Sequence, residues 1–423
     1  MPPSPLPALN PDQILSRLEK LGIRLGLESV RDLLARFGSP QLHYRTVLVA
    51  GSNGKGSTSA LLASMSSAAG WKTGLYTSPH LESVEERLRI DGQAIASGEF
   101  AELLERIIEA AGTEPTYFEA VTAAAFLWFS LRKVDLAVME VGMGGRLDAT
   151  NVCEPELSLI TSISLEHKEH LGDTLAAIAR EKAGTFRPGR PALVWLEDPE
   201  PVEAVKKVAA ELGTDLRFAP ELVTIRQDGR RVKLTTPKGE HDLELALAGR
   251  HQARNLALAV LAAEELGIGL EAIAEGAKSC RWPGRLEKVE LPEGRTVLLD
   301  AAHNPEGAGV LAEYLEGPVD LLFGVLGDKD VTEMLVPLAA KARKVILTTP
   351  ASDRARSPEE LAALLPGREG VEVVPDLGEA LDQALQPGVD LVVCGSIYLI
   401  GEVRKRLRER FGVPEPAVSS ARR

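Results

Sequence analysis

Cysteine is scarce in this chain, and the positions of the few cysteines exclude two kinds of structure. The 423 residues include three cysteines, Cys153, Cys280 and Cys394, which lie far apart and form no CxxC pair. This usage argues against a disulfide framework and against structural zinc. It indicates a reduced, cytoplasmic protein in which each cysteine is a small buried residue.

The chain also lacks long hydrophobic runs and an excess of positive charge. No apolar run reaches the length of about 18 residues that a membrane-spanning helix needs. The Pro-rich start, Met1 to Asp12, lacks the basic patch and apolar core of a secretory signal. With 48 basic and 61 acidic residues, the net charge of −13 disfavours nucleic acid as a partner. We expect no membrane partner, no nucleic-acid partner and a monomer.

What the sequence does contain is two stretches in which apolar strands alternate with helical segments. The first runs from Pro11 to about Pro188, and the second begins at Thr296. Such alternation predicts parallel sheets covered by helices. Between them, residues 191–248 hold short β-rich runs separated by turn signals, which predict a small antiparallel insert.

We therefore expect an α/β protein with two doubly wound domains. The first, residues 1–290, is predicted to be a P-loop ATPase domain that carries the antiparallel insert at about 191–248. The second, residues 296–411, is predicted to be Rossmann-like and to follow a linker at 291–294. Residues 412–423 are expected to form a flexible tail.

The most informative motif lies between residues 46 and 58. An apolar strand leads into the Gly-rich loop G-S-N-G-K-G-S, and small apolar residues then start a helix. Backbone N–H groups and a helix N-terminus would converge on an anion there, with Lys55 on the phosphates and Ser57 on Mg²⁺. The loop departs from the standard Walker pattern, so an ordinary Gly-rich turn is the alternative. The expected phosphate-binding residues are Asn53, Gly54, Lys55, Gly56, Ser57 and Thr58.

Two later strands end in residues that suit a metal site. Glu140 ends the apolar run from Val134, and His167 follows the run 157–163. The carboxyl ends of parallel strands meet at one crevice, so both side chains are expected to point toward Lys55. Glu140 and Ser57 would share one Mg²⁺. Taken alone, His167 is more often an ordinary polar loop residue.

Together these motifs resemble folylpolyglutamate synthase and dihydrofolate synthase, a branch of the Mur ligase superfamily. The resemblance covers nearly the whole chain. Its motifs are the loop 52–57, T-S-P-H-L at 77–81, F-E at 118–119, E-V-G-M-G-G-R-L-D-A-T-N at 140–151, His167, E-K-A-G at 181–184, H-Q at 251–252 with Asn255, W-P-G-R at 282–285, D-A-A-H-N-P at 300–305, D-K-D at 328–330 and G-S at 395–396. Ser52, Glu166 and Ala301 depart mildly from the usual Thr, Asp and Gly.

The resemblance implies an ATP-dependent ligase that adds L-glutamate to a reduced folate and to dihydropteroate. ATP would convert the folate carboxylate into an acyl phosphate, and positioned cations would lower the repulsion between the two anions. The implied cofactors are ATP and Mg²⁺, with a second Mg²⁺ near His167. The resemblance further implies that Lys182 is carbamylated. Without the resemblance, the sequence alone would indicate that Lys182 is a solvated lysine in the last turn of a helix.

The resemblance also assigns roles to residues of both domains. The residues implied to contact the nucleotide outside the loop are His251, Gln252, Asn255, Arg285 and Asp300. The implied catalytic set is Lys55, Lys182, Asp300 and His303. By themselves, the residues at 251–255 read as the polar start of a helix, and Arg285 as a surface arginine after a Pro-Gly turn.

A third set is implied to bind the other substrates. Its members are Ser78, Pro79, His80, Phe118, Thr122, Asp148 and Ser396. Phe118 offers a flat face to a pterin or benzoyl ring, although it could equally belong to the core. Asp148 lies in a motif similar to that of bacterial bifunctional members, and a carboxylate can accept hydrogen bonds from a pterin. This residue is the reason to expect activity on dihydropteroate.

Two other functions are open to the same residues. Another amino-acid ligase of the superfamily would share the phosphate loop, but it often has a further N-terminal domain, and only about 45 residues precede the first expected strand here. An ATP-driven switch or binding protein would also need the loop. The discriminating observation is whether ATP turnover requires a carboxylate and an amine together.

Overall fold

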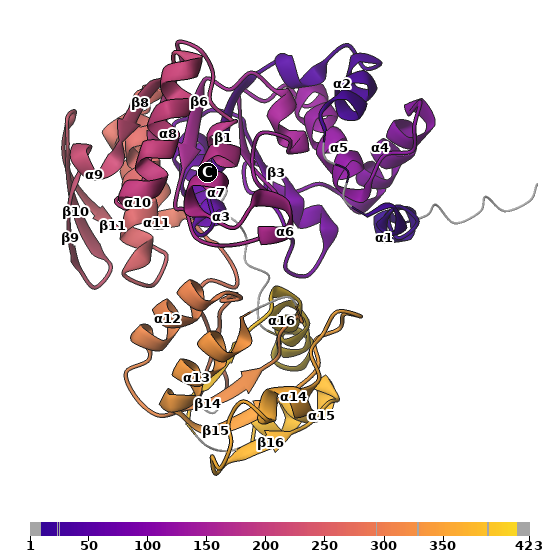
Figure 1. Cartoon of the computed structure of the whole chain (residues 1–423), viewed down its shortest axis with the longest axis vertical. Helices are drawn as coiled ribbons and strands as arrows, with labels where there is room; N and C mark the ends of the chain where they lie inside the picture. The colour runs from indigo at the N-terminus through magenta and orange to yellow at the C-terminus, as the bar shows by residue number, and fades with distance from the viewer. Residues whose placement is uncertain are drawn as a thin grey trace, which may run out of the picture. The chain divides into compact units, whose positions relative to one another are not determined.

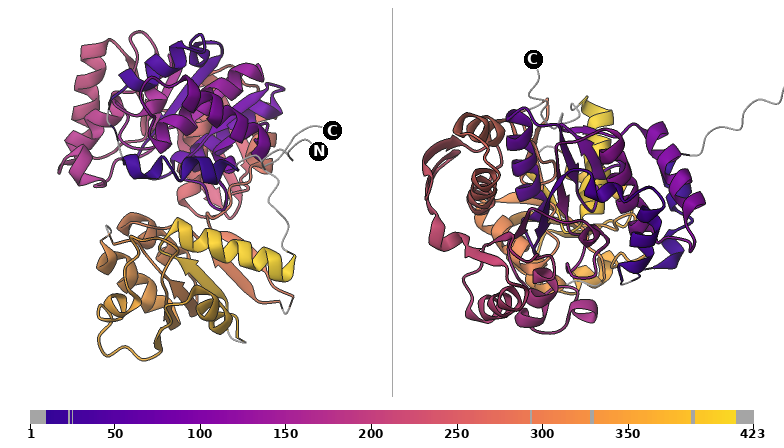
Figure 2. Two further views of the ribbon diagram at one scale, coloured as in Figure 1. Left: turned by 90° about the vertical axis from the view of Figure 1, so that its right-hand side faces the viewer. Right: turned by 90° about the horizontal axis from the view of Figure 1, so that it is seen from above.

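The computed structural model describes residues 10–412, apart from Ile23, Leu25, Glu293, Asp328, Lys329, Pro387 and Gly388. These residues form two compact units (Figures 1 and 2). The first unit holds residues 10–246 and 252–281, and the second holds 247–251 and 282–412. The tail expected after Gly412 and two members of the D-K-D motif lie outside the described residues.

An eight-stranded sheet forms the centre of the first unit. Its strand order is β4-β3-β2-β5-β1-β6-β7-β8, and all neighbours pair in parallel except β2 with β3 and β3 with β4. The strands are β1 (Arg45–Ala50), β2 (Thr73–Tyr76), β3 (Leu88–Ile90), β4 (Gln93–Ala94), β5 (Leu136–Glu140), β6 (Leu157–Ile160), β7 (Pro191–Val194) and β8 (Asp215–Phe218). The predicted strands at the phosphate loop, at Glu140 and before His167 are confirmed as β1, β5 and β6.

Helices of the first unit pack around this sheet. They are α1 (Pro11–Leu15), α2 (Glu28–Ala35), α3 (Lys55–Ala68), α4 (Ser97–Ala110), α5 (Tyr117–Leu131), α6 (Lys168–Leu171), α7 (Leu175–Ala183), α8 (Pro199–Leu212), α9 (Ala219–Leu222), α10 (His251–Glu265) and α11 (Leu270–Ser279). Short 3₁₀ turns are η1 (Glu19–Leu21), η2 (Pro40–Leu42), η3 (Val84–Arg87) and η4 (Ala149–Val152).

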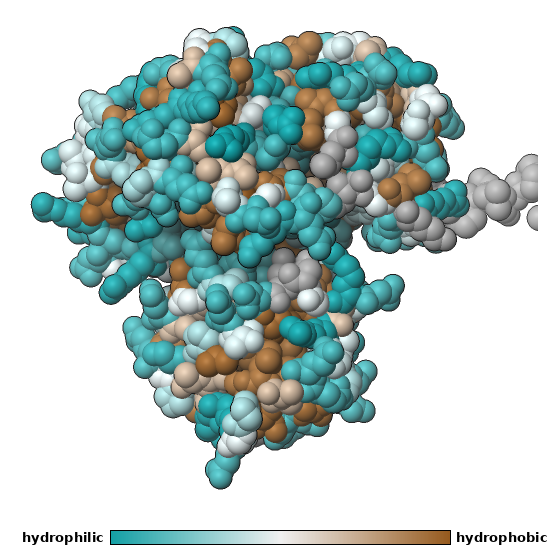
Figure 3. Space-filling model, in the orientation of Figure 1, coloured by the Kyte–Doolittle hydropathy of each residue, from teal (hydrophilic) through white to brown (hydrophobic). Residues whose placement is uncertain are grey.

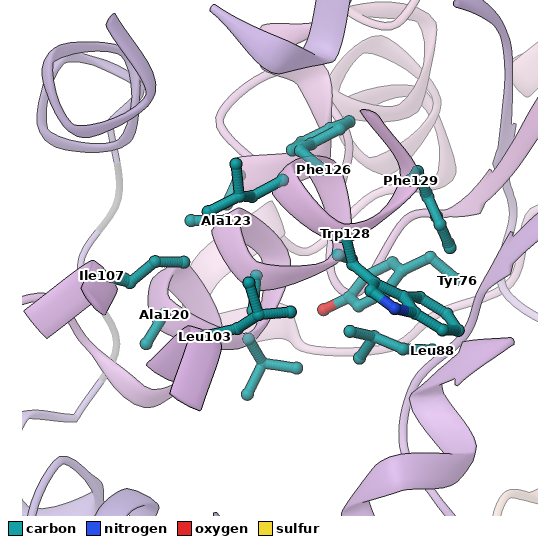
Figure 4. Packing of buried hydrophobic residues seen from close by; sticks show 14 of the residues in the cluster. Tyr76, Leu88, Leu103, Ile107, Ala120, Ala123, Phe126, Trp128 and Phe129 are labelled. Carbon is teal, nitrogen blue, oxygen red and sulfur yellow. The ribbon is translucent and has the colours of Figure 1, made fainter. Parts of the chain in front are cut away.

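Helix α5 shows why one of these helices forms and where it is buried. The Thr116 hydroxyl accepts a hydrogen bond from the Glu119 N–H at 3.3 Å, and the Glu119 carboxylate accepts one from the Thr116 N–H at 2.8 Å, which completes a capping box. The helix that follows is almost wholly apolar, and its Phe126 and Phe129 are fully buried in a cluster with Tyr76 of β2 (Figure 4). This core fixes the strand end that precedes residues 77–81.

The antiparallel insert is smaller than expected. It consists of β9 (Thr224–Asp228), β10 (Arg231–Thr236) and β11 (Gly239–Glu244), which form a separate three-stranded sheet. The expected start near residue 191 was wrong, because β7 and β8 are parallel strands of the main sheet joined by α8. Strand β8 is short, ends the sheet and has no fully buried residue, so its sequence does not look like that of a parallel strand.

The second unit contains a six-stranded sheet with the order β12-β13-β17-β14-β15-β16, parallel except for β12. Its strands are β12 (Glu287–Glu290), β13 (Thr296–Leu299), β14 (Val319–Phe323), β15 (Ala342–Leu347), β16 (Val371–Val373) and β17 (Leu391–Cys394). Its helices are α12 (Pro305–Tyr314), α13 (Val331–Lys341), α14 (Pro358–Ala362), α15 (Leu377–Ala384) and α16 (Ile397–Phe411).

The predicted border between the domains needs a correction. Strand β12 pairs with β13 in the second sheet, so residues 287–290 do not belong to the first domain and the linker expected at 291–294 was wrong. The Leu291 N–H donates to the Arg295 carbonyl at 2.8 Å, as in a tight connection between antiparallel strands. A short segment that contains Pro292 and Gly294 is typical both of a linker and of a hairpin turn, so the sequence does not distinguish the two.

The surface and the cysteines agree with the composition. The face drawn in Figure 3 is mostly hydrophilic, with hydrophobic residues interspersed. Cys153, Cys280 and Cys394 are buried and free, as predicted. Across the described part of the chain, no helix is both long and apolar enough to cross a membrane. An α/β protein with two sheet-containing domains is confirmed.

Candidate active site

The Gly-rich loop connects β1 to α3, and two of its positions accept only glycine. Gly51 has a φ of 145°, and a Cβ there would lie 1.9 Å from the Thr161 Oγ1. Gly54 has a φ of 85°, and a Cβ would lie 2.4 Å from the Asn255 Oδ1. Side chains rarely adopt such φ values, and here they would also collide. The loop is therefore held close to β6 and to α10, with its N–H groups at the start of α3.

Polar side chains from α3 and α10 meet at this loop. The Lys55 ammonium donates to the carbonyls of Gly51 and Ser52 at 2.8 and 3.0 Å. Ser57 is buried in the first turn of α3, and the Gln252 Nε2 donates to its hydroxyl at 3.2 Å. Asn255 in turn donates to the Gln252 Oε1 at 2.8 Å. The structure thus brings together Lys55, Ser57, Gln252 and Asn255, as the sequence predicted for the nucleotide site.

Lys182 lies at the end of α7, but it is not solvated. Only 2% of it is exposed, and its Nζ donates to the Gly51 carbonyl at 2.9 Å and pairs with the Glu166 carboxylate at 2.6 Å. Burial holds the pKa of Lys182 below its usual range despite the opposing carboxylate. Burial would raise the pKa of Glu166, but the charges of Lys55 and Lys182 outweigh it and lower that pKa. The alternative of a solvated surface lysine is excluded.

The candidate metal ligands lie at the end of β5 and after β6, the two strands that flank β1. Glu140 ends β5, is buried, and accepts a hydrogen bond from the Ser78 N–H at 3.1 Å. His167 is the N-cap residue of α6 and lies seven residues after the end of β6, and its φ of 45° is unusual for a residue other than glycine. Among the described residues, no three His, Cys, Asp or Glu side chains form a metal-binding cluster. The donor set fits Mg²⁺, which takes one or two protein ligands and completes its shell with phosphate and water oxygens.

The residues expected to bind a folate lie in two places, and the first of these holds Phe118, Thr122 and Asp148. Phe118 and Asp148 both lie against Gly142, where a Cβ would be 2.5 Å from the Phe118 ring and 3.2 Å from the Asp148 Oδ2. Phe118 is partly buried against the core, and its ring centroid lies 6.3 Å from that of Tyr76. The Tyr76 hydroxyl is 2.9 Å from the Thr122 Oγ1. Phe118, Thr122 and Asp148 therefore surround one end of β2 and β5.

Asp148 is buried, and its own loop uses most of its hydrogen-bonding capacity. Its carboxylate accepts hydrogen bonds from the Met143 N–H at 2.9 Å, the Thr150 N–H at 3.0 Å and the Thr150 hydroxyl at 2.5 Å. Burial raises the pKa of Asp148, although these hydrogen bonds oppose the shift. A carboxylate accepts about four hydrogen bonds, so at most about one is left for a ligand.

The segment 77–81 carries the remaining folate candidates, Ser78, Pro79 and His80. The peptide bond between Ser78 and Pro79 is cis. The His80 Nδ1 accepts a hydrogen bond from the Arg87 Nε at 3.0 Å. Burial and the positive charge of Arg87 lower the pKa of His80 to about 3, so the ring is neutral at physiological pH. Because Nδ1 accepts from Arg87, the proton of the neutral ring is on Nε2, which can donate to a ligand.

Five of the expected site residues belong to the second unit. Asp300 directly follows β13, is buried, and accepts hydrogen bonds from the N–H groups of Leu286 and Ala302 at 2.8 and 2.9 Å. Burial raises its pKa, opposed by Arg285 and by these two hydrogen bonds. His251 packs with this unit, and burial together with Arg285 lowers its pKa to about 4. The other two are His303, beside Ala301, and Ser396, which caps α16.

Two family models match most of the described chain. The Mur ligase middle domain matches residues 49–263, and the Mur ligase glutamate ligase domain matches residues 284–397. A Bacillus subtilis dihydrofolate synthase/folylpolyglutamate synthase is 34% identical over 92% of this chain and 96% of its own length. The chain belongs to the folylpolyglutamate synthase/dihydrofolate synthase branch of the Mur ligases.

Solved structures support this membership at the level of the fold. Escherichia coli FolC in complex with DHPP and ADP has a TM-score of 0.88 and 33% identity, covering 96% of this chain and all of that one. A bifunctional folylpolyglutamate synthase/dihydrofolate synthase with Mn, AMPPNP and L-glutamate bound has a TM-score of 0.84 and 34% identity, covering 93% and 97%.

Some relatives have a chain about twice as long as this one. A probable bifunctional folylpolyglutamate synthase/dihydropteroate synthase of Halobacterium salinarum is 38% identical over 93% of this chain. The chain spans about half of that relative, 51% of its length. The family assignment therefore concerns the Mur ligase part alone.

Two side chains at this site, those of Glu166 and Thr161, were not among the residues predicted from the sequence. Glu166 was noted only as a departure from the family motif, yet it is the ion-pair partner of Lys182. Thr161 was not noted, yet its hydroxyl donates to the Asn53 carbonyl at 2.6 Å and supports the loop. Glu166 stands beside His167 after a predicted strand, which is a usable signal. Nothing in the sequence distinguishes Thr161, because its role depends on the parallel pairing of β1 with β6.

Proposed function

We propose that this ligase adds L-glutamate to a reduced folate and to dihydropteroate through an acyl phosphate. The enzyme is an ATP-dependent ligase that uses a divalent metal ion. The observation that carries the proposal is the link from the phosphate loop to the folate candidates. Glu140, the expected Mg²⁺ ligand, ends β5 and binds the Ser78 backbone, while Phe118 and Asp148 meet at Gly142, two residues further on.

The loop and Lys55 would hold the phosphates of ATP. The Lys55 ammonium already lies over the loop carbonyls, so a small rotation of its side chain brings it to an anion bound at the N–H groups of α3. Ser57 and Glu140 would supply the protein ligands of Mg²⁺. When bound, Mg²⁺ neutralises phosphate charge that would otherwise repel the carboxylate. Gln252 fixes the Ser57 hydroxyl, which orients this ligand.

Lys182 and His167 would serve the second metal ion. Lys182 is buried, and its lowered pKa increases the neutral amine that a carbamate requires. Carbamylation converts its positive charge into a negative one, so the ion pair with Glu166 would have to open. His167 directly follows Glu166, the ion-pair partner of Lys182. Lys182 is thus a proposed modification site rather than a general acid.

The pterin would lie on Phe118, with His80, Thr122 and Asp148 around it. A partly buried aromatic ring offers a flat apolar face for a pterin. Asp148 has room for about one hydrogen bond from the ligand, so its main effect is to fix the loop 142–151 beneath the pterin. Ser78 and Pro79 would line the pocket through their backbone.

The second unit would supply the amine substrate and further nucleotide contacts. Asp300 is held by two backbone N–H groups, and His303 lies three residues later at the start of α12. Both follow β13, the position where ligands bind in open α/β sheets. We assign L-glutamate to His303 and Ser396, and the triphosphate to His251, Arg285 and Asp300. We also propose that the enzyme acts as a monomer in the cytoplasm.

A product assay by mass spectrometry tests the proposal. Purified protein with ATP, Mg²⁺ and L-glutamate is offered dihydropteroate in one reaction and tetrahydrofolate in another. We expect one glutamate to be added to dihydropteroate and one or more to tetrahydrofolate. Addition to tetrahydrofolate alone would remove the proposed role of Asp148. ADP release without either product would instead point to another Mur-type ligase, and ATP turnover without any amine to a switch.

A further inference from the structure

A buried hydrogen-bond donor at the carboxyl edge of the first sheet has no partner. The Nε1 atom of Trp195 is buried, and among the described residues it has no hydrogen-bond acceptor. Buried polar side-chain atoms nearly always have a partner, and an unpaired donor lowers stability. The indole N–H can only donate. The missing partner is therefore an acceptor.

Trp195 lies next to the strand that supports the phosphate loop. It directly follows β7, and its backbone N–H donates to the Ile160 carbonyl at 2.8 Å. Val194 pairs with Ile160 in the parallel register, so Trp195 lies beside Thr161. The Thr161 hydroxyl donates to the carbonyl of Asn53 in the loop at 2.6 Å. Trp195 is thus one strand away from a direct contact of the phosphate loop.

The side chain of Trp195 points to the face of the sheet that α10 covers. Val194 and Leu196 pack with α7 and α8 on one face, so the side chain between them points to the other. In β8, Arg217 pairs with Leu193 and shares the face of Trp195. The Arg217 guanidinium donates to the Glu265 carboxylate at the end of α10 at 2.8 Å. Helix α10 therefore lies over this face.

The first turns of α10 connect the loop after β7 to the phosphate loop. Arg254 lies 3.7 Å from Glu197, two residues after Trp195. The next residue of the helix, Asn255, lies so close to Gly54 that a Cβ there would be 2.4 Å from its Oδ1. All of these residues belong to the first unit. The segment 195–197 therefore runs from beside Thr161 to the start of α10, and both of these lie against the phosphate loop.

We propose that Trp195 is a nucleotide contact whose indole N–H donates to an acceptor on the adenosine part of ATP. The inference rests on the proposed phosphate site and adds a residue to it. The loop amides and Lys55 suffice for the phosphates, and the adenosine extends beyond them. Ribose oxygens and adenine ring nitrogens are the acceptors it offers. The indole ring also gives a flat face against which a base can stack.

Calorimetric titration of the full-length protein tests this contact. Wild type, W195F and W71F are each titrated with Mg-ADP and with magnesium tripolyphosphate. Phe keeps an aromatic ring but removes the N–H, so we expect W195F to raise the Kd for ADP by about 3- to 10-fold. Binding of tripolyphosphate, which has no adenosine, should be unchanged. Trp71 precedes β2 at the opposite edge of the sheet and packs on Arg45, so W71F is a matched control.

Each other outcome has a distinct meaning. Equal ADP affinity in W195F and wild type would overturn the proposal, and so would an equal loss for ADP and tripolyphosphate, which would show that Trp195 only supports the loop. If the wild type binds neither ligand, the proposed phosphate site fails as well. Should W195F fold poorly, the fluorescence of a W71F/W128F/W282F variant, in which Trp195 is the remaining tryptophan, provides the test. Its emission must change with ADP and not with tripolyphosphate, and an emission that ADP leaves unchanged would overturn the proposal.

Discussion

The two sheets hold their candidate site residues in different ways. In the first unit, side chains from separate elements bond to one another: Lys182 of α7 pairs with Glu166 in the segment after β6, and Gln252 of α10 donates to Ser57 of α3. In the second unit, the side chain of Asp300 is held by backbone N–H groups, and His303 contacts a backbone carbonyl.

This difference separates two ways of positioning a site. Side chains that bond across elements fix the distances between strands and helices, which would preorganise the first unit for the phosphate chemistry proposed above. Side chains that bond to nearby backbone fix only the shape of their own connection. Under the proposed assignment, the second unit would offer locally ordered groups to the amine substrate, and changes there should act on that unit alone. Four experiments test this comparison.

The largest effect is expected for K55A. Lys55 is the one loop side chain that carries a positive charge to the phosphates, and loss of such a group typically slows catalysis by roughly 10²- to 10³-fold or more. The free energy of unfolding should fall less than in E166A, because Lys55 hydrogen-bonds to carbonyls of its own loop and acts on Glu166 through its charge alone. Steady-state kinetics and urea unfolding measure the two quantities. K206A, on the exposed face of α8, is the control. Normal ligation by K55A would contradict the assigned site.

A large loss of stability is expected for E166A. The substitution leaves Lys182 buried without its carboxylate, and removing one partner of a buried pair costs about 3–5 kcal/mol. Deprotonation of Lys182, whose pKa is already lowered, reduces this cost at high pH. Urea unfolding at pH 7 and pH 9 measures both effects. E203A breaks an exposed pair with Lys206 and should cost less than about 1 kcal/mol. Equal losses in the two variants would show that the cross-element contact does not matter.

A loss of stability confined to the second unit is expected for D300A. The N–H groups of Leu286 and Ala302 would lose their acceptor, at about 1–3 kcal/mol for each buried group left unpaired. Hydrogen exchange should locate the effect in the second unit and leave the amides of β1 and β6 protected. D242A, on the exposed face of β11, is the matched control. Loss of protection throughout the first unit would contradict the proposed local role.

The smallest effect is expected from two histidines, one in each unit. The folded-state pKa is about 3 for His80 and about 4 for His251, both below the ordinary value of 6.5. Below pH 6.5 the unfolded chain therefore binds protons that the folded protein does not, and stability falls as the pH falls toward those values. H80Q and H251Q should each lessen the loss of stability between pH 7 and pH 5, which denaturant titrations can measure. If neither variant alters that loss, the two rings are not held neutral by burial.

Much of the fold could be predicted from local patterns, and two borders could not. The strands that end at Ala50, Glu140 and Ile160 are apolar runs followed by turn or loop signals, which is enough to predict buried parallel strands. Strand β8 was missed because it ends its sheet and alternates in polarity. Strand β12 was missed because antiparallel pairing with β13 depends on a partner that local sequence does not reveal.

The candidate site divides in the same way. The sequence by itself determined the phosphate loop, since Gly51 and Gly54 can be recognised from spacing alone, and it placed Lys55, Ser57, Glu140 and His167 at strand or helix ends. Only the tertiary structure decided that Lys182 is buried against Glu166, that Thr161 supports Asn53 and that Trp195 faces α10. Spacing along the chain specifies local backbone geometry, whereas burial and ion pairing arise when strands far apart in sequence become neighbours in a sheet.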